Sequence, residues 1–415
     1  MIEKPRSEPR ARQDGTPVPV SPGAFRYDCA LEPDPLFTRM LAESPVCRVN
    51  MPYGQGTCWL VTGYADVRTV TTDPRFSRAA LIGRDYPRIT PAPIAQAEAI
   101  NLMDPPTLTR LRRLVAAAFT TGRVEQLRTV ARREAGQLVD VMVACGAPAD
   151  VADHLAERLP LSMISELLGI PASDRPWLRE QAVAMMSMSP GEADRAVKAR
   201  VGLRAYFAKL TAARRCDPGD DLISAMAAAR VGDDALNADE LTVLAMLLLV
   251  AGHDTTTYEI SNIVYTLLTR PDALAWVRAH PDKLPEAIEE LLRYIPFRQG
   301  VGIPRVATED VQLSGVTIAA GDYVHVSYLA ANRDPAVCPR PDEIDFDRAG
   351  ASPHMTFGSG SHYCLGSHLA RMILQEAVGV LLTRFPHLRL AVPADEVVWN
   401  TVSIWRYPLS LPVAW

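Results

Sequence analysis

The residues from Asn237 to Thr269 have the apolar periodicity of one long helix, and this helix constrains the fold more than any other segment. Asn237 followed by Glu240 is typical of a capping box at a helix start, and Pro271 ends the helix. Its longest apolar run, Leu241 to Gly252, falls short of the roughly 20 residues that a membrane-spanning helix needs. We therefore predict a helix buried in a protein core.

The composition is that of a soluble globular protein. Of the 415 residues, 48% are hydrophobic and 22% are charged, and the 43 basic and 48 acidic side chains give a net charge of -5. This balance favours neither nucleic-acid binding nor attachment to a membrane. Residues 1–24 lack the apolar stretch of a secretory signal, which predicts a disordered leader and a cytoplasmic location. No linker or repeat divides residues 25–415, so we predict a single domain there.

The secondary structure is predicted to be mainly α-helical with small β-sheets. Apolar residues three and four apart cover most of residues 63–300. Alternating, β-branched patterns occur in three shorter segments, at residues 58–62, 311–327 and 397–413.

The densest cluster of unusual residues is FGSGSHYCLGSHLAR, from Phe357 to Arg371, which places Cys364 among three glycines just before an amphipathic helix. The glycines allow close approach to a flat group, and the free amides at the helix start favour a thiolate. With no second cysteine at metal-ligand spacing, this suits one axial bond to an iron held by a macrocycle. The alternatives are a small buried cysteine, or a zinc hydrolase site of His354, His362, Cys364 and His368.

The middle of the long helix is the second unusual feature. Where a buried helix would normally carry leucine, the chain has Gly252, Asp254 and three consecutive threonines, Thr255 to Thr257. Threonine in a helix often donates a hydrogen bond to a carbonyl one turn earlier, and that ordinary role is the alternative to a chemical one.

Together these two motifs resemble those of the cytochrome P-450 monooxygenases. The loop matches the family's haem-binding loop at its aromatic, glycine and cysteine positions, which are Phe357, Gly358, Cys364 and Gly366. Residues 251–255, AGHDT, resemble the family's oxygen-activation motif. The resemblance implies the cytochrome P-450 fold, with a long central distal helix and a cysteine loop preceding a proximal helix. It also implies haem b (iron protoporphyrin IX) with Cys364 as the axial iron ligand, O2 as cosubstrate, and Asp254 and Thr255 as a proton relay.

A third motif that resembles the family's has a structural role. Glu290 and Arg293 lie three residues apart on one predicted helix and resemble the family's Glu-x-x-Arg pair. Arg348 is the candidate for the pair's downstream arginine. The resemblance implies a buried triad that stabilises the fold around the haem and performs no chemistry itself.

The haem propionates need cationic or hydrogen-bonding partners. The resemblance implies three of them, Arg112, Arg305 and His362. Leu108 departs from the pattern, because many actinobacterial relatives carry histidine at that position.

Electrons are expected from separate proteins. The chain has no flavin, nicotinamide or iron-sulfur signature, and the resemblance to bacterial systems implies a ferredoxin and an NAD(P)H-dependent ferredoxin reductase. A non-catalytic haem sensor or carrier is the alternative of another class, but such a protein would have no use for Asp254 and Thr255.

The expected substrate is a bulky secondary metabolite that is hydroxylated or oxidatively coupled. Residues 300–311 and 391–415 are similar to those of actinobacterial members acting on cyclodipeptides, which gives preference to an aromatic cyclodipeptide (diketopiperazine). Hydroxylation of a macrolide or other polyketide is the alternative. The resemblance implies these pocket residues: Leu247, Val250, Ala251, Phe297, Gly300, Val301 and Trp405.

Overall fold

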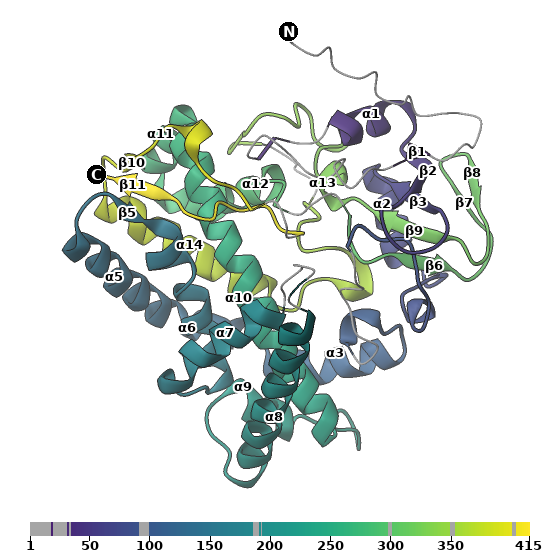
Figure 1. The fold of residues 1–415 in the computed structure, drawn as a ribbon, viewed down its shortest axis with the longest axis horizontal. Helices are drawn as coiled ribbons and strands as arrows, with labels where there is room; N and C mark the ends of the chain where they lie inside the picture. The colour runs from purple at the N-terminus through teal and green to yellow at the C-terminus, as the bar shows by residue number, and fades with distance from the viewer. Residues whose placement is uncertain are drawn as a thin grey trace.

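The computed structural model describes residues 18–19, 31–32, 35–90, 99–185, 191, 193–297, 301–348, 353–400 and 404–415. Helices make up most of it (Figure 1). The α-helices are α1 (Pro35–Glu43), α2 (Tyr64–Thr72), α3 (Thr107–Ala118), α4 (Thr121–Gln126), α5 (Arg128–Cys145), α6 (Leu159–Leu168), α7 (Arg175–Met185), α8 (Ala193–Cys216), α9 (Leu222–Ala228), α10 (Ala238–Thr269), α11 (Pro271–Ala279), α12 (Leu284–Tyr294), α13 (Tyr328–Ala331) and α14 (Ser367–Arg384). The strands are β1 (Val18–Pro19), β2 (Val46–Asn50), β3 (Cys58–Val61), β4 (Phe76–Ser77), β5 (Ala149–Asp150), β6 (Arg305–Ala307), β7 (Val311–Leu313), β8 (Val316–Ile318), β9 (Tyr323–Val326), β10 (Arg389–Leu390) and β11 (Pro412–Ala414).

The strands form three sheets, and the two larger ones lie on opposite sides of the molecule (Figure 1). The six-stranded sheet has the order β1-β2-β3-β9-β6-β4, with β3 parallel to β9 and Cys58 opposite Tyr323. All four side chains of β3 are buried, as expected of a central strand whose sequence is continuously apolar. The smaller sheets are the β7–β8 hairpin and the β10-β11-β5 sheet, in which β11 lies in the middle.

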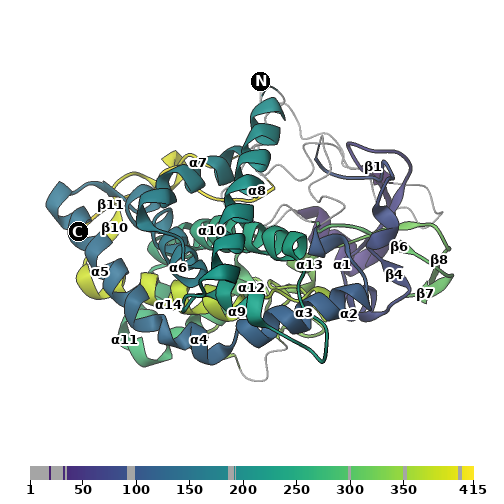
Figure 2. The ribbon, with the colours of Figure 1, turned by 90° about the horizontal axis from the view of Figure 1, so that it is seen from below.

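The long predicted helix is α10, which crosses the centre of the molecule and contacts α6, α8 and α14 (Figure 2). Its capping box is present, because Asn237 and Glu240 each bind the other's backbone amide. Gly252 allows close packing on α6, since a Cβ atom there would lie 3.0 Å from Ile164 Cγ1. By length and composition α10 is the one described helix that could cross a membrane, yet 61% of its most apolar window is buried. It is the core helix that the sequence predicts.

Two of the three predicted β-rich segments form the expected strands: residues 58–62 contain β3, and residues 311–327 contain β7, β8 and β9. The prediction for residues 397–413 is largely wrong. In the part of that segment that the structure describes, strand structure is limited to β11 and an isolated bridge between Trp399 and Pro408. Part of the segment bonds to other parts of the chain, as the Arg406 amide does to the Phe297 carbonyl, instead of to a neighbouring strand.

The predicted leader contains one described element. Strand β1 pairs in parallel with β2, so Val18 and Pro19 belong to the edge of the six-stranded sheet. The other residues of 1–24 lie outside the described part of the chain, and their disorder stays a prediction.

Candidate active site

Cys364 lies in a tight loop just before α14. Its backbone amide donates a 2.9 Å hydrogen bond to the Phe357 carbonyl, which closes the loop. Gly358 and Gly360 have φ angles of 77° and 70°, which glycine adopts without strain. A Cβ atom on Gly360 would lie 2.1 Å from the Thr71 carbonyl oxygen, so only glycine fits there. The loop is thus fixed by backbone geometry and by its contact with α2.

One cavity joins this loop to α10. It is bounded by the loop, one face of α10, the end of α12 and the C-terminal segment. Gly366 borders it, and no atom from another part of the chain lies within 4 Å of where its Cβ would be. This open, largely apolar space beside a cysteine fits a flat cofactor. The predicted site residues that line it are Arg112, Leu247, Ala251, Thr255, Phe297, Phe357, Gly358, His362, Cys364, Gly366 and Trp405.

Groups around Cys364 act on the pKa of its thiol in opposite directions. Burial raises the pKa of the Cys364 thiol, and this outweighs the opposing effects of a hydrogen bond from the Gly366 amide and of the charges of Arg112 and Arg371. The Gly366 amide and the two arginines act in the direction that the sequence predicts, and burial acts against them. A thiolate here needs a further positive charge, which a bound iron would supply.

Three basic side chains, Arg78, Arg112 and His362, line the cavity, and the buried Arg305 does not line it but lies close enough for its charge to act on His362. Burial lowers the pKa of His362, and the positive charges of the three arginines lower it further. Arg305 is 1% exposed, and neither of its terminal nitrogens has a hydrogen-bond partner among the described residues. Because a buried guanidinium is costly without an anionic partner, these residues fit a group that carries carboxylates, as haem does.

Arg78 is a residue that the sequence analysis missed. It follows β4, where its amide donates to Asp104 Oδ1 at 2.9 Å and its Nη1 to the Asn101 carbonyl at 3.1 Å. No motif surrounds it, so only the folded chain shows that it borders the cavity. Leu108, the predicted departure from the family pattern, is buried and also lines the cavity. Arg78 adds a cation to the same cavity.

The structure separates the two residues of the predicted relay. Thr255 borders the cavity, and its hydroxyl donates to the Ala251 carbonyl at 2.9 Å, as in ordinary helical back-bonding. Asp254 is buried but does not border the cavity; its Oδ1 lies 3.1 Å from His253 Nδ1. Burial raises the pKa of Tyr258, and the negative charge of Asp254 raises it further, so the carboxylate lies near that ring.

Glu259 is the second residue that the sequence analysis missed. It borders the cavity one turn after Thr255 and is 4% exposed. Its Oε2 accepts a 3.4 Å hydrogen bond from Asn262, whereas Oε1 has no partner among the described residues. Burial raises the pKa of Glu259 to about 8. The available signal was its spacing, because Ala251, Thr255 and Glu259 follow each other every four residues on one helix face.

The structure brings Glu290, Arg293 and Arg348 together. Arg293 donates from Nε and Nη2 to Glu290, each at 2.8 Å, and Arg348 Nη2 donates to Glu290 at 3.2 Å. The three side chains are between 4% and 7% exposed. Arg293 also donates to the carbonyls of Asn332 and Glu343, so it joins α12 to the segment that leads into the cysteine loop.

The cavity has one aromatic wall. The rings of Phe297 and Trp405 stack with 5.1 Å between centroids and 6° between planes. The Arg406 backbone amide donates to the Phe297 carbonyl at 2.7 Å. The Arg406 carbonyl accepts a 2.8 Å hydrogen bond from Asn262 Nδ2. The C-terminal segment is thus fixed to both α10 and the end of α12.

Two predicted pocket residues are wrong, and one cannot be placed. Val250 lies in the main hydrophobic core, because its position on α10 is rotated away from the face that carries Leu247 and Ala251. Val301 is buried in a separate cluster beside β2 and β3. Gly300 lies outside the described residues.

The zinc alternative has no geometric support. Within the described ranges, no group of three or more His, Cys, Asp or Glu side chains could hold a metal ion. His354 instead lies 3.2 Å from Glu289 through Nε2, and His368 is exposed.

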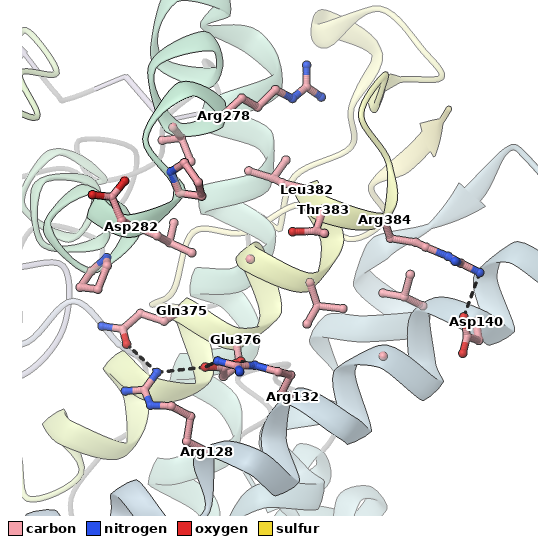
Figure 3. Close-up of a pocket in the computed structure, with 18 residues that line it drawn as sticks. Arg128, Arg132, Asp140, Arg278, Asp282, Gln375, Glu376, Leu382, Thr383 and Arg384 are labelled. Carbon is pink, nitrogen blue, oxygen red and sulfur yellow. Dashed lines mark hydrogen bonds and ion pairs between the residues drawn. The ribbon is translucent and has the colours of Figure 1, made fainter.

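A separate groove lies between α5, α11 and α14 (Figure 3). Arg128 donates there to Gln375 and Glu376, each at 3.0 Å, and Arg132 donates to Glu376 at 2.8 Å. None of the residues that line this groove borders the Cys364 cavity, so it plays no part in the site.

The fold and the site define a haem-thiolate oxidase: a cysteine loop before a helix, a threonine-bearing central helix that borders the same cavity, and a buried arginine, Arg305, whose terminal nitrogens have no partner among the described residues. The cytochrome P450 family model matches residues 207–397. Nocardicin C N-oxygenase of Nocardia uniformis subsp. tsuyamanensis is 44% identical over 94% of this chain and 98% of its own length. Mycinamicin IV hydroxylase/epoxidase of Micromonospora griseorubida is 45% identical over 89% of this chain and 92% of its own.

The solved structures agree. One solved structure is that of cytochrome P450mel 107F1, which is described as having biaryl coupling reactivity. Its sequence is 59% identical, and it superposes with a TM-score of 0.89, covering 95% of this chain and 99% of that one. The chain belongs to the cytochrome P450 family. It is a monooxygenase of actinobacterial type that acts on secondary metabolites and uses haem b, O2 and NAD(P)H-derived electrons delivered by partner proteins. The predicted fold and enzyme class are confirmed, and the sensor or carrier alternative is wrong.

Proposed function

We propose that this enzyme oxidises a bulky aromatic secondary metabolite and couples aromatic rings. The observation that carries the proposal is the stacked pair Phe297 and Trp405, which borders the same cavity as Cys364 and Thr255. Flat aromatic ligands pack favourably on such rings. The biaryl coupling reactivity described for cytochrome P450mel 107F1, at 59% identity, supports the same reading.

The cysteine loop and the basic cluster hold the cofactor in this proposal. Cys364 would bind the haem iron through its sulfur, and Phe357, Gly358 and Gly366 would shape the loop beside it. The bound haem supplies the activation of dioxygen. The residues that hold its propionates are Arg78, Arg112, Arg305 and His362.

In this proposal, α10 carries the side chains that transfer protons. Thr255 places a hydroxyl at the cavity wall, and that hydroxyl could donate a proton into the cavity if it turned away from the Ala251 carbonyl. Asp254, the preceding residue on α10, is buried beside His253 and does not border the cavity, so its part in the relay would need a connecting group such as water. A ferredoxin with its reductase, in the cytoplasm, supplies the electrons.

The substrate class has two candidates. The rings of an aromatic cyclodipeptide could pack on Phe297 and Trp405, and such rings can be coupled by oxidation. A macrolide or other polyketide is the second candidate, because the 45% identical relative is a mycinamicin IV hydroxylase/epoxidase.

An optical titration of the purified ferric protein tests the proposal. We expect a saturable low-spin to high-spin shift with aromatic cyclodipeptides or hydroxylated aromatics, and coupled dimers after turnover with a ferredoxin system. A shift with macrolides alone would overturn the aromatic assignment. A carbon monoxide difference spectrum of the reduced protein is the control for thiolate ligation, and its red-shifted band must be present.

A further inference from the structure

Glu259 is a carboxyl group in an otherwise apolar wall of the cavity. The α10 residues that border the cavity near it are Leu247, Leu248, Ala251, Gly252, Thr255 and Thr256, and none of these is ionisable. Glu259 is 4% exposed, and no salt bridge to it occurs among the described residues. Burial of an acid without a cationic partner is costly, so a requirement of the site must offset that cost.

The hydrogen bonds of Glu259 show which of its two oxygens has no protein partner. Oε2 accepts from Asn262 Nδ2 at 3.4 Å, and Asn262 in turn donates to the Arg406 carbonyl at 2.8 Å. Oε1 is buried, and no group among the described residues bonds to it. Because burial raises the pKa of Glu259 to about 8, the carboxyl carries a proton at neutral pH. With Oε2 already accepting, Oε1 is the atom that carries this proton, and it has no acceptor among the described residues, on a side chain that borders the cavity.

We propose that Glu259 recognises a hydroxyl group on an aromatic substrate by hydrogen-bonding to its oxygen. The inference rests on the proposed function, since it concerns the same cavity, and it names the substrate class more closely. A neutral carboxyl offers both a donor and an acceptor, and a hydroxyl matches both. The ring that bears the hydroxyl packs on Phe297 and Trp405, whose segment is tied to Glu259 through Asn262.

Glu259 has a possible structural role as well, because Asn262 links it to the C-terminal segment. The two roles make different predictions. A structural role changes the binding of all ligands alike, whereas recognition of a hydroxyl changes only the difference between ligands with and without that group. The Glu259→Gln variant keeps a side-chain donor and acceptor of similar shape, and Glu259→Leu has neither.

The test is spectral titration of the haem-loaded protein with two probes, 2-naphthol and naphthalene, which differ by one hydroxyl. Two fused rings match the indole of Trp405 in size. We expect wild type and Glu259→Gln to bind 2-naphthol more tightly than naphthalene by about tenfold, the effect of one buried hydrogen bond. In Glu259→Leu this preference is lost.

A second readout does not depend on turnover or on the haem spectrum. Infrared difference spectra of the wild type contain the C=O stretch of a protonated carboxyl that is absent in Glu259→Gln, and 2-naphthol shifts it whereas naphthalene does not. If wild type binds neither probe, binds both equally, or keeps its preference in Glu259→Leu, the inference is overturned. In all three cases a normal reduced carbonyl band would leave the proposed haem-thiolate function intact, and its loss would overturn that function instead.

Discussion

Arg348 donates hydrogen bonds from both Nε and Nη2 to the Oε1 atom of Glu290, at 3.3 and 3.2 Å. Glu290 also pairs with Arg293, so one buried carboxylate serves two arginines. We expect Glu290→Ala to lower the free energy of unfolding by about 3–5 kcal/mol, because it leaves two buried guanidinium groups without an acid. Denaturant unfolding followed by circular dichroism measures the loss. The control is Glu343→Ala, which breaks an exposed pair with Arg340, and an equal effect in the two variants would contradict a special role of the triad.

Replacing Arg305 should weaken haem retention. Its terminal nitrogens have no hydrogen-bond partner among the described residues, and we assign them to a propionate. We expect Arg305→Met to lower haem affinity by roughly ten- to a hundredfold, which corresponds to one hydrogen bond between charged groups. Transfer of haem to excess apomyoglobin measures the loss. Arg230→Met, at an exposed position, should transfer haem at the wild-type rate. Equal rates in all three proteins would remove Arg305 from the site.

Cys364 should determine the spectrum of the reduced carbonyl complex. We expect Cys364→Ser to lose the strongly red-shifted Soret band, because a serine oxygen cannot donate electron density as a thiolate does. Cys145→Ser, which changes an exposed cysteine at the end of α5, should keep the band. A haem-loaded Cys364→Ser protein with the wild-type spectrum would show that another residue binds the iron.

Thr255→Ala should retain the haem spectrum and lose coupling. The variant lacks the hydroxyl at the cavity wall, so we expect coupled product formation to fall by about tenfold or more while NAD(P)H consumption continues and hydrogen peroxide accumulates. Thr257→Ala is the matched control, because Thr257 lies on the same helix and does not border the cavity. Fully coupled turnover by Thr255→Ala would refute the relay.

Acid should destabilise the protein partly through Glu289. Burial raises its pKa, but hydrogen bonds from His354 and Arg371 and their charges outweigh this and lower the pKa to about 2. An acid with a depressed pKa in the folded state contributes stability above its unfolded pKa, here near 4.5, and loses it as the pH falls toward 2. The melting temperature of wild type should therefore fall more steeply over this range than that of Glu289→Gln. Parallel curves would contradict the assignment.

The sequence was most informative where a contact is local or a motif is dense. The capping box of Asn237 and Glu240 and the pair of Glu290 and Arg293 each span three residues, so the spacing in the chain determines the geometry. The cysteine loop is also short, and its glycines are needed by its own backbone.

The sequence was least informative where tertiary packing decides. Arg78 and Glu259 border the cavity without any motif, and the rotation of α10 alone places Thr255 at the cavity and Asp254 and Val250 away from it. The pKa of Cys364 also depends on burial, which no local pattern shows. These properties arise when distant elements pack together.

The position of β11 has a consequence for how the protein is made. It lies between β10 and β5, and Leu411 next to it donates to Asp150, 261 residues earlier. During translation, the segment that carries β5 leaves the ribosome long before its partner does. The small sheet, and the attachment of the neighbouring C-terminal segment to the cavity, can form only late in synthesis. Until then the cavity lacks the part of its wall that Trp405 contributes.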